Sequence, residues 1–297
     1  MPIAPSELIL NPDGSVYHLN LKPQDIAKTI ITVGDPDRVD SITTFFDSVR
    51  FTTHKREFKT STGVYKGKEI SVISTGIGTD NIDIVFNELD ALVNINLDTR
   101  EIKEKHTSLD IVRIGTSGSI HSSIPIDSFL LSKLAIGLDA LIHFYESKHV
   151  QHPEIQKAFI EHMNWSAAKS EPYVVSCDSA FAKAFLSQKM QIGFTATNIG
   201  FYGPQGRVLR LATSDKEMNS KLGTFFCNDP ENPESQLPIT NLEMETAGIY
   251  GMSKLLGHRA VSLNAIIANR ATNIFSETPK ETVKKLILYT LDCLVNE

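Results

Sequence analysis

The chain has 297 residues, enough to bury a large hydrophobic core as one large α/β domain or two modest ones. Its composition, 41% hydrophobic and 22% charged, is ordinary for a soluble globular protein, and its net charge of −6 with no basic tract argues against a nucleic-acid partner. The N-terminus lacks the basic and apolar regions of a signal peptide, and no apolar run reaches about 18 residues, so we expect no membrane span. Three widely spaced cysteines favour a reducing compartment, and we expect a cytoplasmic protein.

The first predicted strand leads into a candidate anion site. Residues 29–33 are β-branched, which favours a buried strand, and the sequence GDPDR at 34–38 favours a turn into a helix over 39–46. A helix that starts after a strand presents N–H groups where α/β sheets bind ligands, and Arg38 falls in its first turn. A capped helix with an ordinary surface arginine explains the same residues.

The next segments predict strands and a helix. We expect strands over 49–64 and 69–74, then GIG at 76–78 and an amphipathic helix over 81–97. The GxG pair lacks the third glycine and the later acidic residue of a dinucleotide fingerprint, so we exclude a Rossmann NAD site.

Residues 113–119, RIGTSGS, are the most informative segment. They follow the largely apolar residues 109–112, so we expect the end of a buried strand opening into a Gly/Ser/Thr turn. Such a turn offers free N–H groups, hydroxyls and the Arg113 guanidinium without any acid, which suits an oxyanion such as phosphate. A surface turn with a solvated arginine is the alternative.

A candidate ring-binding segment lies in the middle of the chain. Residues 129–144 contain strand candidates, and residues 146–171 predict a polar helical insertion whose histidines lack a metal-ligand spacing. A helix over 180–188 and a strand over 191–198 precede FYGPQGR at 201–207. Two aromatic rings beside an amide and a guanidinium suit a planar, hydrogen-bonding ring, although such residues also form plain loops.

A pair of carboxylates follows an acidic segment. Residues 228–234 predict a flexible acidic loop, and Glu243 and Glu245 flank Met244 just before a small-residue helix over 247–256. Carboxylates accept hydrogen bonds from diols, so a sugar is a natural ligand, although such a pair is often solvated surface. A last buried strand over 259–268 and a helix over 280–294 complete an alternation that predicts a single α/β domain.

Six motifs, in this order, resemble those of the nucleoside phosphorylase-I family. They are GDPDR at 34–38, KREF at 55–58, STGIG at 74–78, RIGTSG at 113–118, EMETA at 243–247 and NR at 269–270. Within the family the chain is most similar to the uridine phosphorylases, on His18 in YHLNL, the residues at 201–207 and Arg270. The resemblance implies one domain over 1–297, a three-layer α/β/α fold with a central mixed sheet, in which 146–171 is an atypical insertion.

The resemblance also implies roles for individual residues. The phosphate-binding residues would be Gly34, Arg38, Arg56, Arg113 and Thr116, with Arg56 reaching in from a neighbouring subunit. The ribose-binding residues would be Met244, Glu245 and, again across an interface, His18. The base-binding residues would be Phe201, Gln205, Arg207 and Arg270.

Partners follow from the same resemblance. Inorganic phosphate is the expected co-substrate, with no organic cofactor, and a potassium ion is implied between subunits near Glu57, Ile77 and Asn81, where Asn81 replaces a usual serine. Residues that act across an interface imply a homo-oligomer, either a dimer or a hexamer built as a trimer of dimers.

The implied reaction is the phosphorolysis of uridine to uracil and ribose 1-phosphate. A phosphate dianion fixed by arginines suits the positive charge that develops at C1′, and Gln205 and Arg207 suit the negative charge that spreads over the departing uracil. The catalytic residues would thus be Arg38, Arg113, Gln205 and Arg207.

Two departures from the family pattern keep other functions open. The usual PGQER reads GPQGR at 203–207, and the insertion at 146–171 is placed to cover the site or to alter subunit packing. Asn269-Arg270 stands where purine-cleaving relatives place an acidic Asp, which favours a pyrimidine instead. A purine or broad-specificity nucleoside phosphorylase, a hydrolytic nucleosidase and a non-catalytic nucleoside-binding protein on the same fold are the alternatives.

Overall fold

A mixed β-sheet of twelve strands forms the centre of the molecule, a computed structural model that describes residues 2–297. Ten strands follow the order β11-β12-β10-β8-β13-β7-β1-β4-β3-β2, while β14 pairs with β13 and β9 with β8. The bounds are β1 Thr29–Val33, β2 Ser48–Lys55, β3 Phe58–Tyr65, β4 Lys68–Ser74, β7 Asp110–Ser119, β8 Phe129–Gly137, β9 Tyr173–Ser176, β10 Met190–Thr197, β11 Phe226–Asp229, β12 Asn232–Glu243, β13 Arg259–Asn269 and β14 Ile274–Phe275. Strands β5 (Ile95–Asn96) and β6 (Glu101–Ile102) form a separate pair.

The sheet closes on itself in its C-terminal half. Besides its pairing with β10, β12 also pairs with β7 in the antiparallel direction, through Asn241↔Ser119 and Leu242↔Gly118. The strands β7, β13, β8, β10 and β12 therefore form a closed ring, while β1, β4, β3 and β2 extend from it as an open sheet. This closure brings the carboxyl end of β12 beside those of β1 and β7.

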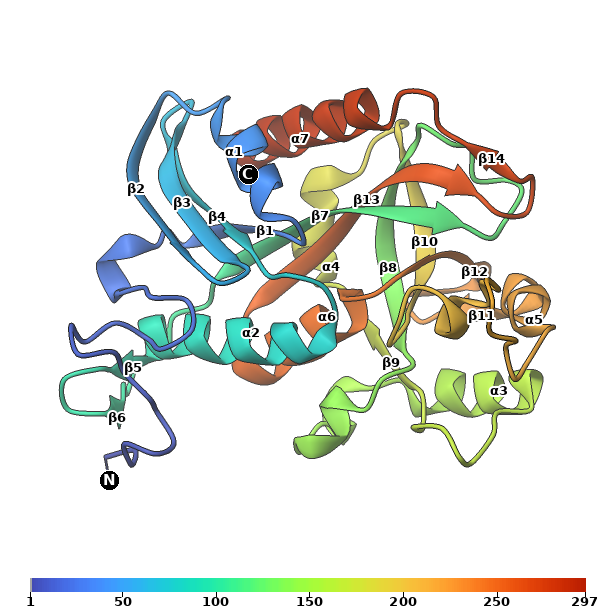
Figure 1. Ribbon diagram of the computed structural model, residues 1–297, viewed down its shortest axis with the longest axis horizontal. Helices are drawn as coiled ribbons and strands as arrows, with labels where there is room; N and C mark the ends of the chain where they lie inside the picture. The colour runs from blue at the N-terminus through green and yellow to red at the C-terminus, as the bar shows by residue number, and fades with distance from the viewer. Residues whose placement is uncertain (1) are drawn as a thin grey trace.

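Helices cover both faces of the sheet, as Figure 1 shows, with α1 and α7 on one side and α2 and α6 on the other. Their bounds are α1 Pro36–Thr43, α2 Thr79–Asn94, α3 Pro153–Met163, α4 Ser179–Ala182, α5 Met218–Thr224, α6 Thr246–Leu256 and α7 Pro279–Asn296. The main core lies between these layers, and a second cluster lies under α3, which buries Ile155, Phe159 and Met163. This arrangement confirms the predicted three-layer α/β/α fold. Among the described residues, no helix is both long and apolar enough to cross a membrane.

The largest correction concerns residues 113–119. The predicted turn is wrong, because β7 continues as a strand through Ser119. Its backbone pairs in parallel with β13 from Asp110↔Arg259 to Ser119↔Asn269. On the other side it pairs with β1 only as far as Thr32↔Arg113, and with β12 only from Gly118. In the described part of the chain, residues 114–117 thus have strand partners on one side only, and their free edge faces the end of β1.

Smaller differences also separate the predicted elements from the observed ones. The predicted strand over 49–64 is a hairpin of β2 and β3, whose turn places Arg56 in the left-handed region at φ 56°. Residues 141–144 form a short 3₁₀ helix rather than a strand, and the helix expected over 180–188 is only α4 followed by a 3₁₀ turn. The expected acidic loop at 228–234 is the hairpin turn between β11 and β12, which pair across it.

Candidate active site

A cavity of about 690 Å³ opens where β1, β4, β7 and β12 end. The carboxyl ends of parallel strands are the usual ligand-binding edge of an α/β sheet. Most of the predicted site residues line it: Gly34, Arg38, Glu57, Ile77, Asn81, Arg113, Thr116, Phe201, Gln205, Arg207, Met244 and Glu245. The segments that carry them lie up to about 200 residues apart in the sequence, and the fold brings them to one place.

Arg38 is positioned by the start of α1. Asp35 caps that helix by accepting a hydrogen bond from the Asp37 N–H at 2.9 Å, and Pro36 occupies its first position. From the first turn, the Arg38 guanidinium crosses to the free edge of β7 and donates to the Ile114 carbonyl at 3.3 Å. Burial and the neighbouring charge of Arg113 lower the pKa of Arg38. Arg38 and Arg113 both line the cavity, so it holds two cations.

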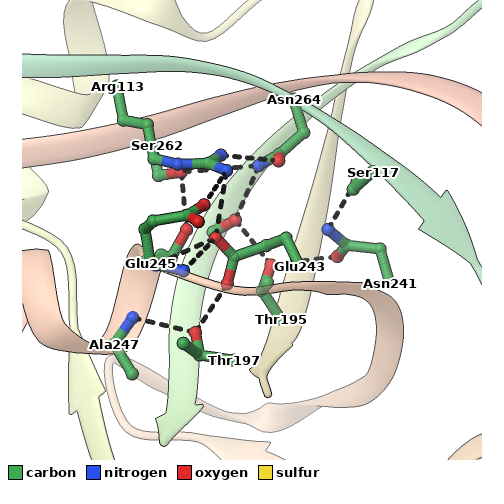
Figure 2. Close-up of polar contacts among 12 residues, drawn as sticks. Arg113, Ser117, Thr195, Thr197, Asn241, Glu243, Glu245, Ala247, Ser262 and Asn264 are labelled. Atoms are coloured by element: carbon green, nitrogen blue, oxygen red, sulfur yellow. Dashed lines mark hydrogen bonds and ion pairs between the residues drawn. The ribbon is translucent and has the colours of Figure 1, made fainter. Parts of the chain in front are cut away.

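Arg113 lies at the centre of a buried polar network, shown in Figure 2. Its Nη2 is 2.7 Å from Glu245 Oε2 and 3.2 Å from Glu243 Oε2, and its Nη1 donates to Asn264 Oδ1 at 3.0 Å. Burial alone would lower the pKa of Arg113, but the two carboxylates outweigh it and raise the pKa. The side chain lies over Gly115, where an added Cβ atom would overlap the guanidinium.

Glu245 and Glu243 have different surroundings. Glu245 Oε1 accepts from the Gly78 N–H at 2.9 Å, which ties the carboxylate to the loop before α2. Burial raises the pKa of Glu245, since it outweighs the attraction of Arg113, and the adjacent charge of Glu243 adds to the rise. Glu243 accepts from Thr197 Oγ1 at 2.6 Å and from the N–H groups of Glu245 and Thr246, each at 2.9 Å, so it holds the start of α6.

The cavity lining also holds an amide and a guanidinium. Gln205 is buried at 2% exposure in a 3₁₀ turn, Gly203–Gln205. Its Oε1 accepts from Arg207 Nη1 at 2.5 Å, and the same Nη1 donates to the Phe201 carbonyl at 2.6 Å. The Arg207 guanidinium also stacks 3.8 Å from the centre of the Phe201 ring. Burial lowers the pKa of Arg207.

Arg270 supports Gln205 from outside the cavity lining. It follows β13, and its Nη1 donates to the Gln205 carbonyl at 2.6 Å. Burial and the nearby charge of Arg207 lower the pKa of Arg270. Its contact therefore fixes the backbone of the residue that faces the cavity.

Two predicted residues, His18 and Arg56, lie away from the cavity of their own chain. His18 Nδ1 is 2.7 Å from Glu88 Oε1, and the same carboxylate accepts from the His18 and Leu19 N–H groups. Arg56 is exposed at the β2–β3 turn, 6.0 Å from the ring of Tyr17, which itself contacts His18 edge-on. Both residues thus lie beside Tyr17, away from the cavity, and their action across a subunit interface stays a prediction.

The residues named for a potassium ion all line the cavity wall near Gly76. Gly76 has φ 71°, and an added Cβ atom there would meet the side chains of Asn81 and Glu57. A carboxylate, an amide oxygen and the Ile77 carbonyl are hard oxygen donors, which suit an alkali cation. The donor set fits the ion, and its binding stays a prediction.

Several members of the Arg113 network had no signal that pointed to them. Asn264 and Ser262 lie inside a buried strand, where nothing in the sequence marks a contact with Arg113. Glu243 was visible as half of a carboxylate pair, but its roles with Arg113 and at the start of α6 depend on the closure of the ring.

Comparisons with known proteins identify the family. Residues 28–290 match the family model described as "Phosphorylase superfamily". The uridine phosphorylase of Thermococcus kodakarensis is 33% identical over 268 residues, 89% of this chain and 81% of that protein. The purine nucleoside phosphorylase DeoD-type of Shewanella amazonensis is 24% identical over 284 residues, 94% and 98% of the two chains.

A solved structure, of a Trypanosoma brucei nucleoside phosphorylase whose description reports uridine phosphorylase activity, superposes with a TM-score of 0.87. The match is 30% identical and covers 98% of this chain and 100% of that one. These findings confirm the resemblance inferred from the six motifs: the chain belongs to the phosphorylase superfamily that contains the purine nucleoside and uridine phosphorylases.

Proposed function

We propose that the protein cleaves uridine with inorganic phosphate to give uracil and ribose 1-phosphate. The observation that carries the proposal is the convergence of Arg38 and Arg113 on one cavity that is also lined by Glu245, Gln205 and Arg207. Phosphorolysis needs an anion subsite, a sugar subsite and a base subsite in that spatial order. This cavity offers suitable groups for each.

The phosphate subsite would lie between α1 and the free edge of β7. Arg38 and Arg113 supply cationic donors, and Thr116 supplies a hydroxyl on the same strand. Arg56 from a neighbouring subunit would add a third cation. Gly34 directly follows β1 and has no side chain, so the backbone there can come close to a bound anion. Only the Gly76 carbonyl oxygen lies within 4 Å of a Cβ atom added at Gly34.

The ribose subsite would lie between this anion and the base. Glu245 lies 2.7 Å from Arg113, so its carboxylate can accept hydrogen bonds from the ribose hydroxyls while it remains fixed by the arginine. Met244 lines the same wall. His18 of a neighbouring subunit would contact the 5′-hydroxyl.

In the reaction the bond from C1′ to N1 of uracil breaks, and its electron pair leaves with the base. Positive charge develops at C1′, where the phosphate dianion stabilises it and then forms the new C–O bond. Gln205 and Arg207 donate hydrogen bonds to the uracil anion, which then takes a proton from water. No side chain acts as a nucleophile in this scheme.

The base subsite favours a pyrimidine over a purine. By the family resemblance, purine-cleaving relatives place an acidic Asp here, and Asn269, the last residue of β13, occupies that position. Its Nδ2 donates to the His121 and Ile124 carbonyls at 3.0 and 2.8 Å, and its Oδ1 accepts from the Ala271 and Thr272 N–H groups. With all its hydrogen-bonding capacity used, Asn269 has no proton to give to a leaving base.

The test is the phosphate-dependent release of free base from uridine, deoxyuridine, thymidine and inosine, followed by ultraviolet absorbance. We expect rapid turnover of uridine only when phosphate is present. Faster turnover of inosine would favour a purine enzyme, and turnover without phosphate would favour a hydrolase. Tight nucleoside binding without turnover would favour a binding protein. The mass of the protein in solution tests the expected homo-oligomer, which the proposed roles of Arg56 and His18 require.

A further inference from the structure

The turn that carries Gln205 is anchored by Asn219. Gly206, which follows Gln205, adopts the left-handed conformation with φ 66°. A Cβ atom added to Gly206 would lie 2.5 Å from Asn219 Nδ2, so a larger residue fits there only if the asparagine side chain moves. Because residue 206 is a glycine, the Asn219 side chain can occupy the space that a side chain at 206 would take.

Asn219 makes a specific contact from this position. It lies in the first turn of α5, and its Nδ2 donates to the Gln205 carbonyl at 3.1 Å. Arg270 Nη1 donates to the same carbonyl at 2.6 Å. Two donors from separate elements thus bond one backbone oxygen. Together they fix the orientation of the Gln205 peptide group.

The orientation of the Asn219 amide follows from chemistry. The Gln205 carbonyl can only accept a hydrogen bond, so the amide must present its nitrogen to it. The Asn219 Oδ1 atom is buried and has no hydrogen-bond partner among the described residues. A buried polar atom without a partner is costly, which argues that the asparagine is not present merely to fill space.

We propose that Asn219 is a positioning residue for base recognition, which acts through the Gln205 carbonyl to aim the Gln205 and Arg207 side chains at the base. The inference rests on the proposed function for the identity of that base. It explains how the GPQGR sequence of this chain, with glycine at 206, holds a defined turn. Asn219 itself lines a neighbouring cavity rather than the active site.

Three substitutions separate a donor role from a packing role. Asn219→Asp keeps the shape but faces the Gln205 carbonyl with an oxygen, Asn219→Leu keeps the bulk, and Asn219→Ala removes both. A donor role predicts that Asn219→Asp is at least as damaging as Asn219→Ala, with kcat/KM for uridine lowered about tenfold or more and KM for phosphate within about twofold of the wild type. A packing role predicts near-normal Asn219→Asp and Asn219→Leu variants, and that result would overturn the proposal. Asn228→Asp, on the exposed side of β11, is the matched control.

Hydrogen–deuterium exchange provides a readout that does not depend on turnover. We expect the backbone amides of Gly203 and residues 205–207 to exchange faster in Asn219→Asp than in the wild type, with no change in Asn228→Asp. Unchanged exchange would also overturn the proposal. If the wild-type protein cleaves no uridine, the proposed function fails, while the exchange experiment still decides whether Asn219 holds the turn.

Discussion

Arg113 Nη2 lies 2.7 Å from Glu245 Oε2, and this ion pair joins the proposed phosphate subsite to the proposed ribose subsite. Both side chains are buried, and Glu243 adds a second carboxylate at 3.2 Å. Loss of one partner of a buried pair leaves an uncompensated charge, which typically costs about 3–5 kcal/mol. The pair therefore fixes the direction of the guanidinium before any ligand binds.

A single methyl group should test this fixed geometry. In Gly115→Ala the new Cβ atom would overlap the Arg113 guanidinium, while the backbone at 115 is ordinary strand that alanine tolerates. The guanidinium must leave Glu245, so we expect kcat/KM to fall about 100-fold or more, as when a preorganised donor is removed.

The control is Gly223→Ala, where the nearest atom to the added Cβ is the Ile120 carbonyl oxygen at 3.4 Å. Circular dichroism should show that both variants fold. Full activity of Gly115→Ala would contradict the assigned position of Arg113.

The raised pKa of Glu245 predicts a pH dependence. Burial raises the pKa of this carboxyl above 4.5, the ordinary value for glutamate, so it takes up a proton earlier as the pH falls. The protonated carboxyl is a poorer acceptor for ribose hydroxyls, so kcat/KM for the nucleoside should decline as the pH falls through the raised pKa. The same profile measured for Glu245→Gln should be lower at neutral pH and should lack this acid limb. An unchanged limb in the variant would assign it to another group.

Local patterns in the sequence are sufficient to predict most of the strands, because β-branched runs such as residues 29–33 mark buried strands wherever they occur. Local patterns give the wrong prediction for the segment 113–119, because its Gly, Ser and Thr residues are typical of turns. It is a strand because β13 pairs with it along its full length and β12 closes the ring at Gly118, and pairing between distant segments leaves no local signal. The anion-binding interpretation stays a prediction, now placed at the unpaired edge of that strand beside Arg38.

The candidate site was predictable where a motif carries its own chemistry. Arg38, Glu245 and Gln205 could each be chosen from residue type and position, and the structure brings all three to one cavity. The contacts that hold the Arg113–Glu245 pair were not predictable, because Asn264 and Gly78 come close to the pair only once the sheet has formed. His18 and Arg56 lie away from the cavity of their own chain, as the family resemblance implies for residues that act across a subunit interface, and that action stays a prediction.

Removal of the Arg207 side chain should impair chemistry at the base end. Its guanidinium bonds Gln205 Oε1 and the Phe201 carbonyl and stacks on the Phe201 ring, so it is preorganised for negative charge on the base. We expect Arg207→Ala to lower kcat/KM for uridine about 100-fold or more, by analogy with the removal of oxyanion donors. Arg210→Ala, exposed in the same loop, is the control and should stay within about twofold. Equal effects of the two substitutions would mean that the loop charge, and not this contact, matters.

The carboxylate of Glu88 should determine how strongly His18 contributes to recognition of the ribose 5′-hydroxyl. It holds the His18 ring at Nδ1 over 2.7 Å and also accepts from the His18 and Leu19 N–H groups, so Nε2 is the ring atom that remains free to contact a ribose 5′-hydroxyl in a neighbouring subunit. Glu88→Gln should therefore reduce the preference for uridine over 5′-deoxyuridine about tenfold, the effect of one hydrogen bond.

His18→Ala should reach the same end point, and the double variant should be no worse than His18→Ala alone, because the two residues act through one contact. Glu104→Gln, at an exposed position after α2 in the sequence, serves as the charge-matched control. Steady-state kinetics with the two nucleosides measure each preference as a ratio of kcat/KM, which cancels any loss of folded protein. Additive effects of Glu88→Gln and His18→Ala would show that Glu88 acts on the fold instead, since only a shared contact makes the second substitution silent.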